Sequence, residues 1–101
     1  MPTEKDYIII SSNLISFCIE QGITNYAEIV LLAKIITMSK AKGYCYASNQ
    51  YFMDLLKVSK RSIERYITDL RERGLIRCTY RYEGKQIVGR TIYLQDATKE
   101  M

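Results

Sequence analysis

Residues 48–70 read SNQYFMDLLKVSKRSIERYITDL, and this stretch decides the fold. Ser48 precedes one short segment with apolar residues at helical spacing, and Ser59 precedes a second segment at about 60–73, with residues 57–58 between them. Serine is a preferred helix N-cap, and a spacing of three or four residues marks one face of a helix. The stretch therefore predicts two helices joined by a tight turn, the pattern of a helix-turn-helix. The predicted inward side chains are Phe52, Leu55, Leu56, Ile63, Ile67 and Leu70.

After Gly74, which we expect to end the second helix, the sequence period changes to two. Glu83-Gly84-Lys85 predicts a turn, and a second strand is expected at about 88–94, with Ile92 and Leu94 directed at the core. A hairpin after the two helices predicts a winged helix-turn-helix, mainly α with a small β-sheet (α+β), in a single domain over residues 1–101. Ile76, Cys78, Tyr80 and Tyr82 form the predicted apolar face of the first strand, and Arg77, Thr79, Arg81 and Glu83 form its charged face.

The N-terminal half contributes further elements. The most apolar of them is a helix at about 25–40, which starts at a capping box formed by Asn25 and Glu28. Because it is apolar nearly all round, we expect it to be the buried centre of the fold, with surplus apolar surface that leaves a homodimer face open. The other predicted elements are a strand at 7–10, a helix at 11–21 ended by Gly22, a turn at 41–43 and a strand-like link at 44–46. The polar tail 95–101 fits a frayed end or the stub of a linker.

Charge is unevenly distributed along the 101 residues. Residues 1–53 carry four basic and four acidic side chains, whereas residues 54–94 carry ten basic and five acidic ones, and residues 95–101 have a net charge of −1. The helix-turn-helix and the hairpin therefore hold a net charge of +5. This distribution favours a polyanionic partner, although a solvated basic face has the same composition.

The outward face of the second predicted helix has the residue types that read duplex DNA. Arg61 and Arg65 are one helical turn apart. An arginine fork can bind guanine O6 and N7, with about 1–3 kcal/mol of discrimination. Ser48 and Asn49 stand at the start of the first helix, where backbone N–H groups can bind a phosphate. Helix N-capping alone accounts for these two residue types equally well. Hairpin side chains can follow the backbone or enter the minor groove. The predicted DNA-contacting residues are Ser48, Asn49, Lys57, Lys60, Arg61, Ser62, Arg65, Arg81, Lys85, Gln86 and Arg90.

Some neighbours of this face have a structural interpretation. Glu64 is spaced to form a local pair with Lys60. Tyr66 lies beside the inward stripe, so we expect it to pack in the core. Thr68 and Asp69 are expected to complete the outward face.

The sequence argues against an enzyme. It has no histidine, no glycine-rich phosphate loop and no nucleophile elbow, and its one candidate nucleophile, Cys45, has no base beside it. Cys18, Cys45 and Cys78 are widely spaced, so we expect free, buried thiols in a reducing cytoplasm rather than a disulfide or a zinc site. No metal and no cofactor are expected. The N-terminus has no signal-peptide pattern, and the apolar run 29–36 is well short of the roughly 20 residues that span a bilayer. We therefore expect a soluble cytoplasmic protein without membrane contact.

Several segments resemble a known family. They are GYCYASN at 43–49, LKVSKRSI at 56–63, LRERGLI at 70–76, YIII at 7–10 and RTIYL at 90–94. Together they are similar to the N-terminal winged-helix domain of replication initiators, the replisome organisers and plasmid initiators of phages and plasmids of Gram-positive bacteria. The resemblance implies a domain that binds repeats in a replication origin, often as a dimer, and a further domain that recruits host replication proteins.

The leading prediction is thus sequence-specific binding of double-stranded DNA, with origin repeats as the target. A transcriptional regulator would use the same surface. A hypothesis from a different class is a protein-interaction module, in which the winged helix binds a partner protein or a second copy of itself. The chain stops near the end of the family's domain, which fits either an excised domain or a small stand-alone protein.

Overall fold

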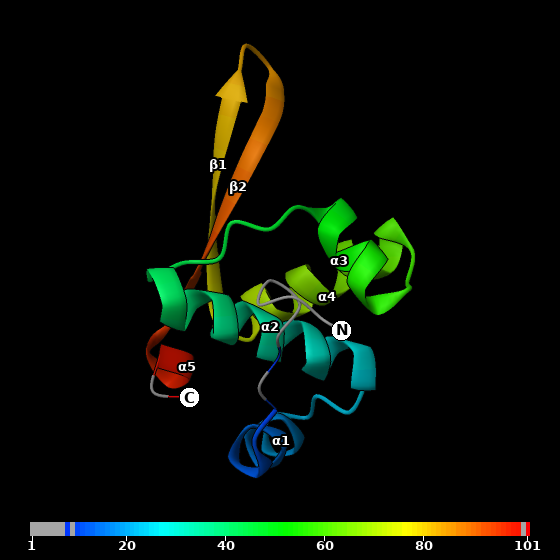
Figure 1. Cartoon of the computed structure of the whole chain (residues 1–101), viewed down its shortest axis with the longest axis vertical. Helices are drawn as coiled ribbons and strands as arrows, with labels where there is room; N and C mark the ends of the chain where they lie inside the picture. Colours follow the sequence, from blue (N-terminus) through cyan, green and yellow to red (C-terminus); the bar gives the residue numbers. More distant parts are fainter. Residues whose placement is uncertain (1–7, 9, 100) are drawn as a thin grey trace.

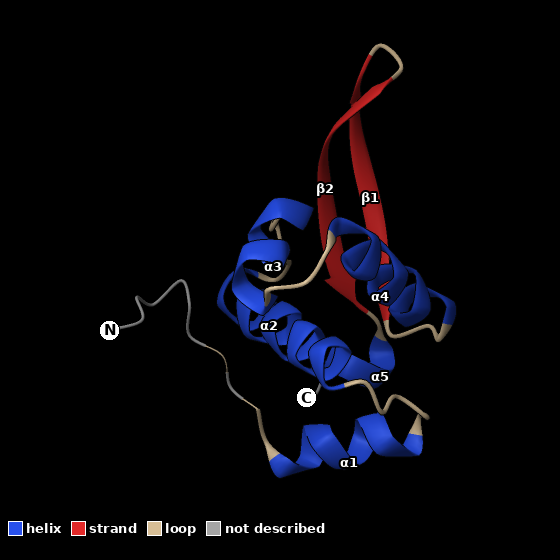
Figure 2. Cartoon of the chain, turned by 90° about the vertical axis from the view of Figure 1, so that its right-hand side faces the viewer, coloured by secondary structure: helices blue, strands red, loops and turns tan. Residues whose placement is uncertain are grey.

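Five helices and one β-hairpin make up the part of the chain that the structure, a computed structural model, describes: residues 8, 10–99 and 101 (Figure 1). Their order is α1 (Ser12–Glu20), α2 (Tyr26–Lys42), α3 (Asn49–Leu56), α4 (Lys60–Glu72), β1 (Ile76–Glu83), β2 (Gln86–Leu94) and α5 (Asp96–Lys99). The helices pack into one body, and the hairpin projects from it beside α3 and α4 (Figure 2). The predicted fold class, mainly helical with a small antiparallel sheet, is confirmed.

Helices α1 to α4 each begin at a side-chain cap. A side-chain oxygen of the cap residue accepts a hydrogen bond from the backbone N–H three residues further on, at 3.1 Å in each case. Removing such a cap costs about 1 kcal/mol, so these positions determine where the helices start. The cap residues are Ser11, Asn25, Ser48 and Ser59. The predicted starts of all four helices are confirmed.

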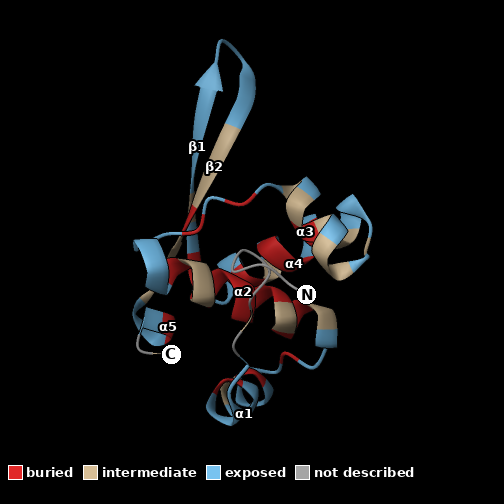
Figure 3. Ribbon diagram, viewed as in Figure 1, coloured by how far each residue is buried: buried red, intermediate tan, exposed pale blue. Residues whose placement is uncertain are grey.

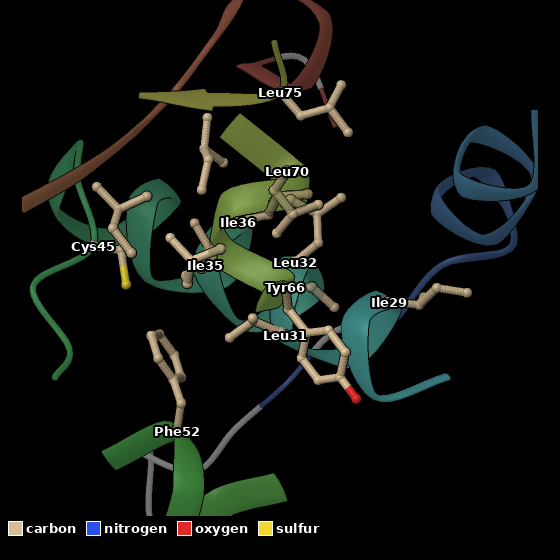
Figure 4. Close-up of a cluster of buried hydrophobic side chains, with 14 of the residues drawn as sticks. Ile29, Leu31, Leu32, Ile35, Ile36, Cys45, Phe52, Tyr66, Leu70 and Leu75 are labelled. Carbon is tan, nitrogen blue, oxygen red and sulfur yellow. The ribbon is translucent and has the colours of Figure 1, made fainter. Parts of the chain in front are cut away.

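Helix α2 is the centre of the core, where Phe52 of α3 and Leu70 of α4 are also buried (Figure 4). A helix that is apolar on all sides is stable only when it is covered on all sides. Five of its large aliphatic side chains are buried within the protomer, whereas Tyr26 is 76% exposed and Val30 and Met38 are half-buried. The homodimer face predicted on this helix therefore stays a prediction. The buried residues are Ile29, Leu31, Leu32, Ile35 and Ile36.

The C-terminal end of α2 lies beyond its predicted end at about residue 40. Ala41 and Lys42 continue the helix, so the turn predicted at 41–43 is wrong at these two positions. Gly43 ends the helix in the left-handed conformation with φ 87°, and its N–H donates to Ser39 O. A glycine at this position is the ordinary stop signal, and nothing before it in the segment opposes helix formation.

The hairpin pairs β1 and β2 antiparallel from Ile76 and Leu94 at its base to Glu83 and Gln86 at its tip. β2 begins two residues earlier than predicted, because residues 84–85 alone form the turn. At the base, Cys45 and Ile92 exchange two backbone hydrogen bonds of 2.8 Å. The strand-like link predicted at 44–46 is thereby confirmed.

Only the base of the hairpin is packed (Figure 3). Ile76, Ile92 and Leu94 are buried as predicted for this end, whereas Tyr80 and Tyr82 are 37% and 60% exposed. The apolar face predicted for β1 is therefore packed only at the base of the strand, and its distal half is exposed. An alternating pattern shows that two faces differ, and it does not show how far the body extends to cover one of them.

The C-terminal tail is folded against the body. Residues 96–99 form α5, and Thr98 is fully buried with its Oγ1 donating to Leu75 O at 2.7 Å. The expectation of a frayed tail is wrong for these residues. For the strand predicted at 7–10, residues 7 and 9 lie outside the described residues, and Ile8 and Ile10 are in irregular backbone.

Candidate nucleic-acid interface

Helix α4 presents a basic face at its N-terminal half. Ile63, Tyr66, Ile67 and Leu70 are buried on one side of the helix, as predicted for all four. The opposite side leaves exposed the side chains of Lys60, Arg61, Arg65 and Thr68. Ser62 is half-buried, and its hydroxyl is hydrogen-bonded to Ser59 Oγ at 3.1 Å. The structure therefore places Ser62 in the capping network at the helix start and leaves the three cations accessible.

The charge of this face changes along the helix. Arg61, Arg65 and Thr68 line a shallow depression on α4 together with three acidic residues, Glu64, Asp69 and Glu72. The predicted pairing of Lys60 with Glu64 is found at 4.0 Å, with both side chains more than half exposed. Such exposed pairs contribute little to stability. The positive potential is therefore concentrated in the first two turns of α4, the part of a recognition helix that contacts base edges.

Asp69 is half-buried at the edge of this outward face, and it also makes internal contacts. Its Oδ2 accepts from Arg73 Nε at 2.8 Å, and Arg73 Nη1 donates to Gln21 O. Glu28 of α2 is buried beside the pair, and burial together with hydrogen bonding to Asp69 raises the pKa of Glu28 to about 8. The same hydrogen bond lowers the pKa of Asp69, so the two carboxyls share one proton at neutral pH. This group attaches α4 to α2 and to the end of α1.

The N-terminus of α3 is next to the base of the hairpin. Ser48 caps α3, and Asn49 Oδ1 accepts from Arg90 Nη1 at 2.7 Å. Arg90 Nη2 donates to Ala47 O at 3.0 Å, and its guanidinium lies 6.0 Å from the centroid of the Phe52 ring. Arg90 is therefore directed into the protein, and it does not lie at the hairpin tip with the other predicted contacts. The hydrogen bond between Asn49 and Arg90 therefore joins the hairpin to α3.

The hairpin tip carries Lys85 and Gln86, which are both exposed. Arg81 lies nearer the body, with its guanidinium 4.7 Å from the centroid of the Tyr46 ring. A Cβ on Gly89, the cross-strand partner of Arg81, would overlap this guanidinium, so glycine leaves room for it. Arg81 is thus held against the α2–α3 link by a cation–π contact, while Lys85 and Gln86 extend into solvent.

Two further side chains shape this surface, and the sequence singles out only one of them, Lys57. Arg71 of α4 donates from Nη1 to Tyr80 Oη of β1 at 3.1 Å, which fixes the hairpin against α4. Lys57, predicted as a contact, occupies the turn between α3 and α4 with φ 58°, where its N–H donates to Met53 O. The place of Arg71 in the last turn of α4, just before the hairpin, is a signal that it could contact the hairpin. No local pattern indicates which strand residue it contacts.

The three cysteines are free thiols. Cys18 and Cys45 are buried as predicted, and Cys78 is only half-buried. Cys45 Sγ lies 3.7 Å from Met38 Sδ, and burial raises the pKa of this thiol. Among the described residues, no group of His, Cys, Asp and Glu side chains could hold a metal ion. No helix over residues 8, 10–99 and 101 has the length and apolarity needed to cross a bilayer.

Comparison with known proteins agrees with this architecture. A family model described as a helix-turn-helix domain matches residues 25–76, more than half of the 101 residues. The chain belongs to this helix-turn-helix family. The family match runs from the cap of α2 to the first residue of β1, so it includes both helices of the motif and the central core helix.

A solved structure has the same fold as this helix-turn-helix protein. It is a MarR family regulator from Neisseria meningitidis, with a TM-score of 0.55 and 17% sequence identity. The match covers 87% of this chain and 56% of that chain, so this chain spans little more than half the length of the regulator. At this identity the likeness establishes the fold alone, and it confirms the predicted winged helix. No curated protein sequence matches the chain.

Proposed function

We propose that this helix-turn-helix protein binds double-stranded DNA at specific sequences, with α4 in the major groove. The observation that carries the proposal is the exposure of Lys60, Arg61 and Arg65 on the first two turns of α4 while the opposite face is buried. Phosphate contacts by lysine and bidentate base contacts by arginine are the two interactions that such a helix needs. Arg61 and Arg65 are the proposed base-reading residues.

The surroundings of α4 support this orientation. The N-terminus of α3, which Ser48 caps, adds backbone N–H groups, and the hairpin adds Lys85 and Gln86 at its tip. Arg90 and Arg71 join the hairpin to α3 and to α4 respectively. The three proposed contact regions therefore have fixed relative positions, as a duplex with fixed groove spacing requires.

The proposed setting is replication initiation in a phage or plasmid, at repeats in the origin. This part of the proposal is supported by the resemblance of segments 43–49, 56–63 and 70–76 to replication initiators. Transcriptional regulation is the second candidate, and it is supported equally by the shared fold of the MarR family regulator. Both functions use the same DNA-binding surface, and in both two copies would read repeated half-sites.

Selection of bound duplexes from a random pool tests the proposal and separates the two settings. We expect one enriched motif, and we expect it to occur as clustered repeats at a replication origin of the source genome. Enrichment at promoters would favour the regulator. A titration with salt provides the second measurement, since binding should weaken with a slope of about −0.9 for each phosphate contact. Absence of duplex binding at low salt would exclude both settings and favour a protein-interaction module.

A further inference from the structure

A cavity of about 470 Å³ lies at the base of the hairpin, on residues that the proposed DNA contacts do not include. Its walls come from four parts of the fold: the end of α2, β1, β2 with the residue that follows it, and α5. This volume lies within the range of about 300–1,000 Å³ that small-molecule sites occupy. The cavity is therefore large enough for an organic ligand and not only for a simple ion.

The walls of the cavity are basic. Lys40, Arg77 and Lys99 contribute to them, and none of the described residues that line the cavity is acidic. Arg77 is held in place because its guanidinium lies 4.4 Å from the centroid of the Tyr93 ring, which lines the same cavity. Three cations from three different elements converge here, which is the arrangement that binds an anion with several oxygens.

Two of the three cations have exposed partners within the protein. Lys99 lies 3.8 Å from the exposed carboxylate of Asp96, and Lys40 Nζ donates to a main-chain oxygen of Met101, the last residue of the sequence, at 2.5 Å. Among the described residues, no Asp or Glu carboxylate lies at ion-pair distance from Arg77. The cavity therefore keeps a net positive charge.

A buried hydroxyl provides a second, independent observation. Ser39 lines the cavity, is 6% exposed, and has an Oγ with no hydrogen-bond partner in the described part of the chain. Buried polar atoms are normally paired, and one that is not indicates a missing partner. The unpaired Oγ of Ser39 therefore belongs to a residue of the cavity wall.

We propose that this cavity binds a small organic anion that carries phosphate or carboxylate groups. The guanidinium of Arg77 provides a planar pair of donors for two oxygens, and Lys40 and Lys99 add two point charges around it. This inference does not depend on DNA binding, because the cavity residues and the residues proposed to contact DNA are different.

The test is a calorimetric titration of the full chain at constant ionic strength, with pyrophosphate and with citrate as separate probes. We expect one saturable site for at least one probe, and the better probe identifies phosphate or carboxylate as the preferred group. Arg77→Gln should weaken that binding by about tenfold or more. Arg81→Gln is the matched control, because Arg81 is on the same face of β1 and also lies over a tyrosine ring, but outside the cavity. It should change the affinity by less than about twofold.

Two results would overturn the proposal. One is absence of saturable binding of either probe at millimolar concentration. The other is an equal loss of affinity in Arg77→Gln and Arg81→Gln, which would show attraction to the basic hairpin as a whole. Should Arg77→Gln fail to fold, as judged by circular dichroism, Lys99→Gln takes its place, since that side chain is 63% exposed. Unchanged binding in Lys99→Gln would equally contradict the site.

Discussion

Arg90 of β2 and Asn49 of α3 are joined by a hydrogen bond of 2.7 Å between Nη1 and Oδ1, across 41 residues of sequence. The same guanidinium donates to Ala47 O, so it satisfies two acceptors at the start of α3. From the sequence alone, both residues are predicted DNA contacts. In the structure they fix the position of the hairpin relative to the helix-turn-helix.

We predict that Arg90→Ala lowers the free energy of unfolding by about 1–3 kcal/mol, because two charge-assisted hydrogen bonds are lost. Asn49→Ala should cost about 1 kcal/mol, since Arg90 keeps its bond to Ala47 O. Urea unfolding of both single variants and of the double variant measures the coupling. Additive effects of the two substitutions would contradict a direct interaction.

Arg65→Ala is predicted to reduce discrimination among DNA sequences by about 1–3 kcal/mol at one base position. The physical reason is that Arg65 is exposed on the second turn of α4 and is free of ion pairs in the described part of the chain. Competition between the selected duplex and its single-base variants measures the effect. An unchanged order of preference would show that Arg65 does not read a base.

Lys85→Ala should weaken binding to all duplexes by a similar factor, because a lysine at the hairpin tip contacts phosphates rather than base edges. The slope of log affinity against log salt should become shallower by about 0.9, the value for one phosphate contact. Filter binding at several salt concentrations provides both numbers. A change that depends on the DNA sequence would instead assign a reading role to the tip.

The stability of the protein should depend on the protonation of Glu28. Burial first, and then hydrogen bonding to Asp69, raise its pKa from 4.5 to about 8, while Arg73 and Arg65 act in the opposite direction. Between these two values the folded protein binds more protons than the unfolded chain, so the free energy of unfolding decreases as pH rises. The slope is at most about 1.4 kcal/mol per pH unit for one proton.

Glu28→Gln tests this dependence, because glutamine can still donate to Asp69 and does not titrate. We expect the variant to have a flatter profile between about pH 5 and 9. Urea unfolding across this range compares it with the parent protein. Parallel profiles for the two proteins would exclude Glu28 as the titrating group.

Lys57→Gly is predicted to stabilise the protein by up to about 1 kcal/mol, since Lys57 has φ 58°, which is unfavourable for a side chain with a Cβ. Thermal unfolding measures the gain. Lys57→Ala is the control, because it removes the charge and keeps the unfavourable backbone. A stabilisation equal in both variants would indicate charge repulsion rather than backbone strain.

The sequence predicts most of the fold because the deciding signals are local. The caps at Asn25, Ser48 and Ser59 and the glycine stop at Gly74 act within one helical turn, so they can be recognised without knowledge of the rest of the chain. The extent of packing along the hairpin is not local. It depends on where the body ends, and Tyr80 and Tyr82 extend beyond it.

For the candidate site, too, the sequence predicts the features that depend on local spacing. The outward position of Arg61 and Arg65 follows from helical spacing alone. The roles of Arg90 and Asp69 do not, because each is determined by a partner distant in sequence, Asn49 for one and Glu28 for the other. When the sequence pattern places a charged residue on an outward face, its role as a DNA contact or as an internal contact can be decided only once its partner is known.

Tyr80 and Arg90 are cross-strand neighbours in the hairpin. Tyr80 is hydrogen-bonded to Arg71 of α4, and Arg90 is hydrogen-bonded to Asn49 of α3, so this one residue pair is attached to both helices. The conformational entropy of the hairpin base is thus lost when the protein folds and not when it meets DNA. On binding, the ordering cost is confined to the side chains of the tip and of the exposed α4 face, about 0.5–1.5 kcal/mol for each one immobilised. Removing the contacts of Arg71 with Tyr80 and of Asn49 with Arg90 would make the entropy of DNA association less favourable, even where every DNA-contacting residue is retained.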